Sequence, residues 1–140
     1  MITLPLILSF IFFILGIIHL NWVIGGTFGF AESLPTKETG ERVLNPKKLD
    51  SAIVGLCLMC FSFFYLIKAD LIRFDLPSWV LKYGSWLIPT VFILRSVGEF
   101  KYIGFFKKIK HTAFGQLDTK VYSPLCFFIG IIGILMQILK

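Results

Sequence analysis

Four apolar stretches dominate the pattern of hydrophobic and polar positions along this chain. A membrane-spanning helix needs roughly 20 mostly apolar residues. The first and fourth stretches reach that length on their own, whereas the second and third reach it only with polar flanking residues. Backbone amides inside a bilayer must be satisfied within their own segment, so all four are predicted to be helices. The pattern predicts an all-α integral membrane four-helix bundle with short loops, a single transmembrane domain over residues 1–140 with spans at about 4–26, 49–68, 78–98 and 120–139.

Composition agrees with a membrane protein and excludes most other classes. Of the 140 residues, 56% are hydrophobic and 16% are charged, and the mean hydropathy is +0.84. Sixteen Phe cannot all be hidden inside a small water-soluble domain, because such domains keep much of their surface exposed. A soluble enzyme, a disordered tail and a disulfide-rich scaffold are therefore excluded. The first stretch lacks a basic start and a small-residue cleavage site, so it is not a signal peptide.

The formal charge of +6 does not indicate nucleic-acid binding, because the basic residues flank the apolar stretches. Most of them fall in the first and third loops. By the positive-inside rule these two loops face the cytoplasm and both termini face outward. The prediction is a multi-pass protein of the inner (plasma) membrane, oriented by Lys37, Arg42, Lys47 and Lys48 in the first loop and by Arg95, Lys101, Lys107, Lys108, Lys110 and Lys120 in the third.

Small residues at helical spacing predict where the helices pack. Gly16 lies in the first stretch, Gly55 and Ser62 lie in the second, and Gly130 lies in the fourth. Small side chains let membrane helices approach closely, so these positions are expected at helix–helix contacts.

Polar residues gather at the cytoplasmic ends of the predicted spans. His19 is the most informative, because an ionisable residue within a span usually faces the bundle interior and serves a function. Arg95 and Glu99, at i and i+4, are expected on one helix face, where Glu99 would pair with Arg95. The candidates for acid–base catalysis are His19, Glu99 and Asp118; no cofactor is identified and no metal site is expected. The predicted ligand-binding pocket consists of His19, Trp22, Arg95, Glu99, Asp118, Tyr122 and Ser123.

Each of these residues also has a simpler interpretation. Trp22 and Tyr122 would suit the aromatic belt at a membrane interface. Arg95 and Glu99 would form a weak surface pair, and Asp118 would be an exposed loop charge. His111 lies among lysines and is expected to be solvated.

The third loop interleaves aromatic residues with lysines. We call residues 99–117 the aromatic–basic segment; it contains Phe100, Phe105 and Phe106 beside Lys101 and Lys108. Such a mixture suits a segment lying on an anionic inner leaflet. It would equally suit a lid folded over the polar pocket, and composition does not choose between the two.

Cys57 and Cys60 form a C-x-x-C motif in the second stretch, and Cys126 lies in the fourth. A membrane C-x-x-C would shuttle electrons to a quinone, but that chemistry needs further cysteines in a loop to reload the pair. The interpretation as small hydrophobic packing residues is therefore favoured.

Several short stretches together form a recognisable pattern: His19–Gly26, Arg95–Phe100, Gly104–Lys107, Thr112–Phe114, Asp118–Thr119 and Tyr122–Cys126. In these stretches the chain resembles a bacterial family of small four-span membrane proteins catalogued as domain of unknown function 3995. The similarity covers nearly the whole chain and implies a four-helix membrane fold without an activity. Two positions depart from the family pattern as we expect it: Glu99 in place of Asp, and Asn21 in place of an aromatic residue.

Three classes of function compete. The favoured one is a membrane protein that binds or transforms a small amphipathic or lipid-like molecule in the cytoplasmic half of the bundle; whether it is an enzyme stays open, as does assembly into a homo-oligomer. The alternative is a structural subunit of a larger membrane complex. An exporter is less favoured, because such proteins place an acidic residue near the bilayer midplane, and a quinone-linked thiol oxidoreductase is disfavoured with the C-x-x-C chemistry.

Overall fold

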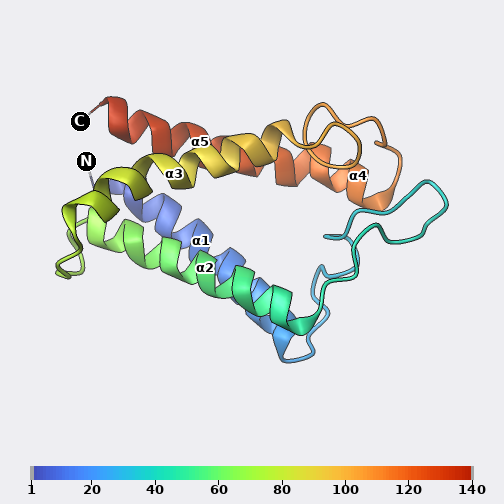
Figure 1. The fold of residues 1–140 in the computed structure, drawn as a ribbon, viewed down its shortest axis with the longest axis horizontal. Coiled ribbons are helices and arrows are strands. Elements are labelled where there is room, and N and C mark those ends of the chain that lie inside the picture. Colours follow the sequence, from blue (N-terminus) through green and yellow to red (C-terminus); the bar gives the residue numbers. More distant parts are fainter. Residues whose placement is uncertain (1, 140) are drawn as a thin grey trace. The chain divides into compact units, whose positions relative to one another are not determined.

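The computed structural model describes residues 2–139 and contains four long helices (Figure 1). They are α1 (Thr3–Val23), α2 (Lys48–Lys68), α3 (Ser78–Val97) and α5 (Ser123–Ile138). A short helix α4 (Ala113–Leu117) and a π-helical turn η1 (Asp118–Tyr122) lead directly into α5. The predicted all-α fold with four long helices is confirmed. The chain divides into two compact units, residues 2–28 with 46–84 and residues 29–45 with 85–139, so α3 begins in one unit and continues in the other.

In the first unit α1 and α2 lie side by side (Figure 1). Ser9 and Ser62 exchange hydrogen bonds between them: each hydroxyl donates to the other residue's carbonyl oxygen at 2.9 Å. A Cβ on Gly16 would meet Met59, and one on Gly55 would meet Leu20. Small and hydroxyl-bearing residues thus allow the close approach that membrane helices use, as the sequence predicted.

Local signals explain where these helices begin and end. The Asp50 carboxylate accepts the N–H of Lys47 at 2.7 Å, which satisfies a free donor at the start of α2. At the end of α1, Gly25 has a φ of +96°, a left-handed conformation that favours glycine. Helix α1 therefore ends at Val23, before the predicted limit at residue 26.

In the second unit, α3 packs against α5 at Gly130. A Cβ on Gly130 would lie 3.1 Å from the carbonyl oxygen of Pro89 and would overlap the Ile93 side chain. The last helix begins before the predicted start of the last span. The Thr112 hydroxyl caps α4 by accepting the N–H of Gly115 at 3.0 Å, so the helix starts at Ala113 rather than near residue 120.

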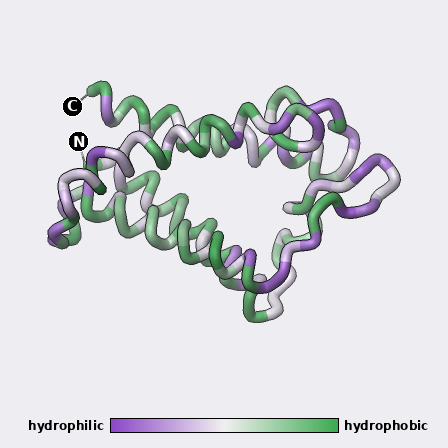
Figure 2. Tube along the Cα trace, viewed as in Figure 1, coloured by the Kyte–Doolittle hydropathy of each residue, from purple (hydrophilic) through white to green (hydrophobic). Residues whose placement is uncertain are grey.

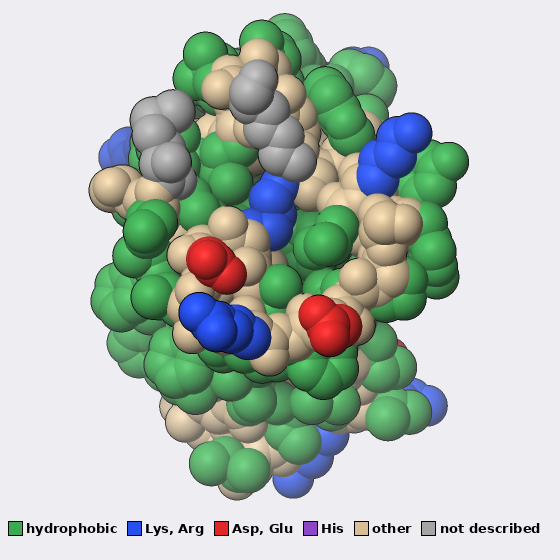
Figure 3. All heavy atoms as spheres, turned by 90° about the vertical axis from the view of Figure 1, so that its left-hand side faces the viewer, with side chains coloured by type: hydrophobic (Ala, Val, Ile, Leu, Met, Phe, Trp, Pro, Cys, Tyr) green, Lys and Arg blue, Asp and Glu red, His purple; other side chains and the backbone are tan. Residues whose placement is uncertain are grey.

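Within residues 2–139, three helical segments are long and apolar enough to cross a membrane: Thr3–Val23, Lys48–Lys68 and Ala113–Ile138. Helix α3 is not among these candidates; it carries Lys82 and Arg95. Hydrophobic residues predominate along the long helices, whereas hydrophilic residues concentrate in the connecting segments (Figure 2). Hydrophobic side chains predominate on the face shown in Figure 3, as lipid contact requires.

Candidate functional site

Asp118 lies at the centre of a buried polar cluster in the second unit. Its side chain has no exposed surface. One carboxylate oxygen accepts from Nη2 of Arg95 at 2.7 Å. The other accepts from the Gly104 N–H at 2.8 Å, and from Lys107 Nζ and the Ser123 hydroxyl at 3.0 Å each. We call Arg95, Gly104, Lys107, Asp118 and Ser123 the Asp118 cluster.

Lys107 is as deeply buried as Asp118. Its ammonium group donates to Asp118, to the Gly104 carbonyl oxygen at 3.0 Å and to the Thr119 hydroxyl at 2.6 Å. An ammonium group has three donors, so every one of them is used. Lys107 is not among the residues predicted for the pocket, because in the sequence it is one of several basic residues of the third loop.

The π-helical turn brings the Ser123 hydroxyl to the carboxylate of Asp118. The N–H of Ser123 donates to the carbonyl of Asp118, five residues earlier, which widens the helix by one residue at this point. Pro124 follows immediately, and its nitrogen has no hydrogen to continue the regular ladder. Single π-helical turns often mark functional sites, because they reorient side chains that a regular helix would point elsewhere.

Arg95 comes from the last turn of α3, and its side chain is 30% exposed. One terminal nitrogen, Nη2, is committed to Asp118, whereas Nη1 is buried and has no hydrogen-bond acceptor among the described residues. The Asp118 cluster therefore combines two cations with one carboxylate and leaves Nη1 of Arg95 without an acceptor among the described residues.

Glu99 does not pair with Arg95, contrary to the expectation from their spacing. Its carboxylate accepts from the backbone N–H groups of Tyr102 and Ile103, the latter at 3.2 Å. Helix α3 ends at Val97, and Gly98 has a φ of +82°. The i, i+4 relation is therefore lost, because Glu99 lies beyond the helix and organises the following turn.

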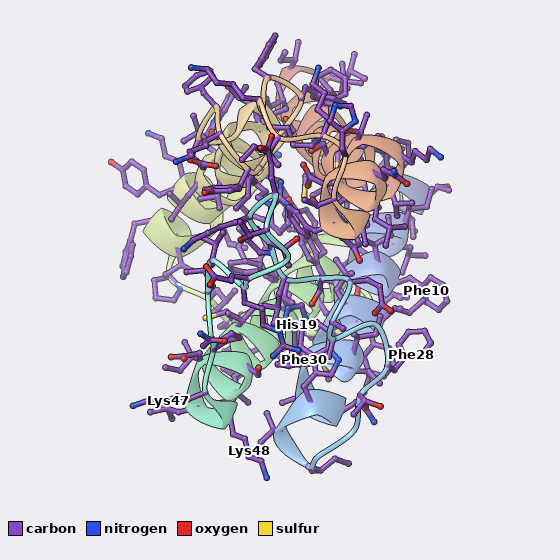
Figure 4. The ribbon with its side chains drawn as sticks, turned by 90° about the vertical axis from the view of Figure 1, so that its right-hand side faces the viewer. Phe10, His19, Phe28, Phe30, Lys47 and Lys48 are labelled. Atoms are coloured by element: carbon purple, nitrogen blue, oxygen red, sulfur yellow. The ribbon has the colours of Figure 1, made fainter. Side chains whose placement is uncertain are left out.

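His19 and Trp22 belong to the first unit. Nδ1 of His19 donates to the Leu15 carbonyl oxygen at 2.8 Å in the tautomer that satisfies both atoms. Its ring centre lies 4.6 Å from that of Trp22, whose indole nitrogen donates to the Phe28 carbonyl oxygen at 2.6 Å. Figure 4 labels His19 on α1 and Lys47 and Lys48 at the start of α2. The predicted convergence of His19 and Trp22 with the Asp118 cluster stays a prediction.

The other residues predicted for the pocket differ in whether they belong to the Asp118 cluster. Ser123 is a member of the Asp118 cluster. Tyr122 packs its ring 5.9 Å from that of Phe114, and its hydroxyl lies 3.5 Å from the Glu32 carbonyl oxygen. Cys57 and Cys60 form no disulfide and are exposed on α2.

Comparison with known proteins identifies the family to which the chain belongs. The family model described as "Protein of unknown function (DUF3995)" matches residues 12–133, which is most of the chain. No curated protein and no solved structure matches the chain. With three helical segments able to cross a membrane, the chain is a multi-pass membrane protein that belongs to the DUF3995 family of unknown function.

Proposed function

We propose that this protein binds a small amphipathic or lipid-like molecule whose polar head group is held by Arg95. The observation that carries the proposal is the Nη1 group of Arg95, which is buried and lacks an acceptor among the described residues. A buried donor without a partner costs about 1–3 kcal/mol. A ligand oxygen at this position would remove that cost.

The charges of the Asp118 cluster favour an anionic head group. Arg95 and Lys107 carry two positive charges, and Asp118 alone opposes them. Guanidinium groups bind carboxylates and phosphates through parallel hydrogen bonds, and Arg95 has used only one side of its fork. A carboxylate or phosphate on a hydrophobic tail therefore fits both the site and its membrane surroundings.

The cluster supports binding more than catalysis by Asp118. Four donors already occupy the two oxygens of Asp118, so this carboxylate is not free to accept a substrate proton. Of the predicted acid–base groups, His19 keeps its Nε2 available, because Nδ1 bonds to Leu15. If the bound molecule is transformed, His19 is the residue to test.

The experiment compares bound molecules in purified variants. Wild type, Arg95→Gln and Lys82→Gln are purified in mild detergent, and native mass spectrometry with solvent extraction identifies what each retains. Both substitutions remove one positive charge from α3, but Lys82 is exposed and lies outside the cluster. We expect an acidic amphipathic molecule on wild type and Lys82→Gln and its loss from Arg95→Gln. Equal retention by all three, or none in wild type, would refute the proposal.

The alternative function, a structural subunit of a larger membrane complex, is favoured by the same saturation of Asp118. A carboxylate with four donors serves well as a clasp that fixes the aromatic–basic segment. The mass of the particle extracted from native membranes with a mild detergent distinguishes the two functions. A subunit would migrate with a mass far above that of the 16.0 kDa chain, and Arg95→Gln would not change it.

A further inference from the structure

The aromatic–basic segment is a fixed structure. Gly98 and Gly104 have φ angles of +82° and +92°, and their backbones pass so closely that a Cβ on either would overlap the carbonyl of Ile103 or Val97. The Phe105 N–H donates to the Ser96 carbonyl oxygen at 2.8 Å. Together with Lys107 and Gly104 on Asp118, these contacts hold the segment against the ends of α3 and α5.

This fixed segment presents large aromatic side chains outward. Phe106 is 64% exposed and Phe100 is 56% exposed, and their rings lie 6.5 Å apart. Phe100 has a φ of +69°, a conformation that side-chain-bearing residues rarely adopt. Such a conformation persists only where surrounding structure enforces it, so the exposure of Phe100 follows from how the segment is held.

Exposed lysines lie close to these aromatic residues in the sequence. Lys101, Lys108 and Lys110 are exposed, and none forms an ion pair with a residue in the described part of the chain. Lys107, in contrast, turns inward to Asp118. The segment thus separates its lysines: one is used to hold the fold, and three keep their charge at the surface.

The aromatic surface continues onto the membrane-spanning helix. The ring of Phe105 packs edge-to-face on Phe127 at 6.1 Å, and Phe127 and Phe128 are exposed on α5. Residues Ala113–Ile138 form a 26-residue helical stretch, about 39 Å long at 1.5 Å per residue. A hydrocarbon core of about 30 Å leaves roughly 9 Å for the two ends together. With the C-terminal end at the opposite boundary of the core, the α4 end reaches the level of the lipid head groups.

We propose that the aromatic–basic segment is a docking surface for anionic lipids. Phe100 and Phe106 enter the boundary between hydrocarbon and head groups, and Lys101, Lys108 and Lys110 bind acidic head groups there. Aromatic residues with flanking lysines are the side chains that anchor segments at this depth. A single lysine near an anionic surface changes binding by about fivefold, so three acting together make a lipid preference measurable.

The test measures the depth of a nitroxide at position 106 in nanodiscs. Phe106→Cys is spin-labelled in a background with Cys57, Cys60 and Cys126 replaced by Ala, and the collision rates with oxygen and with a water-soluble nickel chelate are compared. Discs contain phosphatidylcholine alone or with phosphatidylglycerol. The control label replaces Glu38, which is exposed in the first loop. Retention of native unfolding behaviour is checked for each labelled protein.

We expect the label at 106 to favour oxygen over nickel, and to move deeper when phosphatidylglycerol is added. Replacing Lys101, Lys108 and Lys110 together by Gln should abolish that lipid-dependent shift, whereas the label at 38 should contact nickel in both discs. Shielding of the label at 106 from both reagents would mean that protein covers it. Nickel contact equal to that at position 38 would place it in water. Either result overturns the proposal.

Discussion

The ammonium nitrogen of Lys107 lies 3.0 Å from Oδ2 of Asp118, and neither side chain has exposed surface. Bringing two such charges out of water costs several kcal/mol for each ion. That cost is tolerated because Asp118 also accepts from Arg95, Gly104 and Ser123, while Lys107 also donates to Gly104 and Thr119. The pair therefore closes the loop between α3 and α4 with every donor of Lys107 satisfied.

Removing the charge of Asp118 should destabilise the protein strongly. Asp118→Asn leaves Lys107 buried without a counter-charge, and breaking a buried pair costs about 3–5 kcal/mol. SDS titration in detergent micelles, followed by circular dichroism, measures the change in the free energy of unfolding. The control is Glu41→Gln, which breaks the exposed Lys37–Glu41 pair at 3.0 Å and should cost under about 1 kcal/mol. Equal costs would contradict the role of the cluster.

Glu99→Gln should be mild by comparison. The i, i+4 spacing predicts that Glu99 pairs with Arg95, and breaking such a buried pair would cost about 3 kcal/mol. In the structure Glu99 accepts backbone N–H groups of Tyr102 and Ile103, and a glutamine oxygen can accept both. The expected cost is about 1 kcal/mol or less, measured in the same titration. A loss of unfolding free energy as large as that of Asp118→Asn would instead support an ion pair between Arg95 and Glu99.

The helices were predictable from sequence because their signal is long and repeated. Each apolar stretch has no stable state in a bilayer other than a helix, and Gly16, Gly55 and Ser62 indicated the α1–α2 contact correctly. The start of the last helix was not predictable from hydropathy. Gln116, Asp118 and Thr119 are polar, but the Thr112 cap and the partners of Asp118 extend the helix through them.

The candidate site was only partly predictable. Arg95, Asp118 and Ser123 were identified because charged and polar residues close to span ends are uncommon. Lys107 was missed because its neighbours Lys101 and Lys108 have the same composition and the same apparent context. What distinguishes it is the close approach of the Gly98 and Gly104 backbones, which turns Lys107 toward Asp118. The inward position of Lys107 depends on the conformation of the folded loop, and no periodic pattern in the sequence indicates it.

Gly104 should therefore be intolerant of a side chain. Gly104→Ala requires an unfavourable left-handed φ of +92° and brings Cβ into the Val97 carbonyl, so we expect a loss of about 3 kcal/mol from strain and overlap together. Gly40 is the matched control, because its φ is +86° and no atom lies within 4 Å of an added Cβ. Gly40→Ala should cost about 1 kcal/mol. Similar costs in the unfolding titration would show that the overlap relaxes freely.

The thiols should be dispensable. Cys57 and Cys60 lie on the exposed side of α2 and form no disulfide, so replacing both by Ala should change stability by less than about 0.5 kcal/mol. Binding of the molecule identified with wild type should persist as well. Mass spectrometry and the unfolding titration measure the two properties. Loss of a bound quinone in the double variant would instead support thiol-linked electron transfer.

Helix α3 should cross the membrane as the fourth span, although it is less apolar than the other three. Its exposed side chains Trp79, Tyr83, Leu87, Val91 and Leu94 form an apolar stripe along the helix, which lipid would cover and water would not. The positive-inside rule then predicts that the first and third loops lie in the cytoplasm and that both termini lie outside. If α3 did not cross the membrane, the second and third loops would lie on the same side of it.

Impermeant maleimide labelling of intact cells separates these arrangements. Single cysteines replace Glu38, Asp75 and Lys110, one exposed residue from each loop, in a background with Cys57, Cys60 and Cys126 replaced by Ala. We expect labelling at position 75 alone, with positions 38 and 110 labelled only after the membrane is permeabilised. Labelling of 75 and 110 together would show that α3 does not cross. Labelling of 38 and 110 without 75 would keep four spans but reverse the orientation, because the positive-inside bias would then point the wrong way.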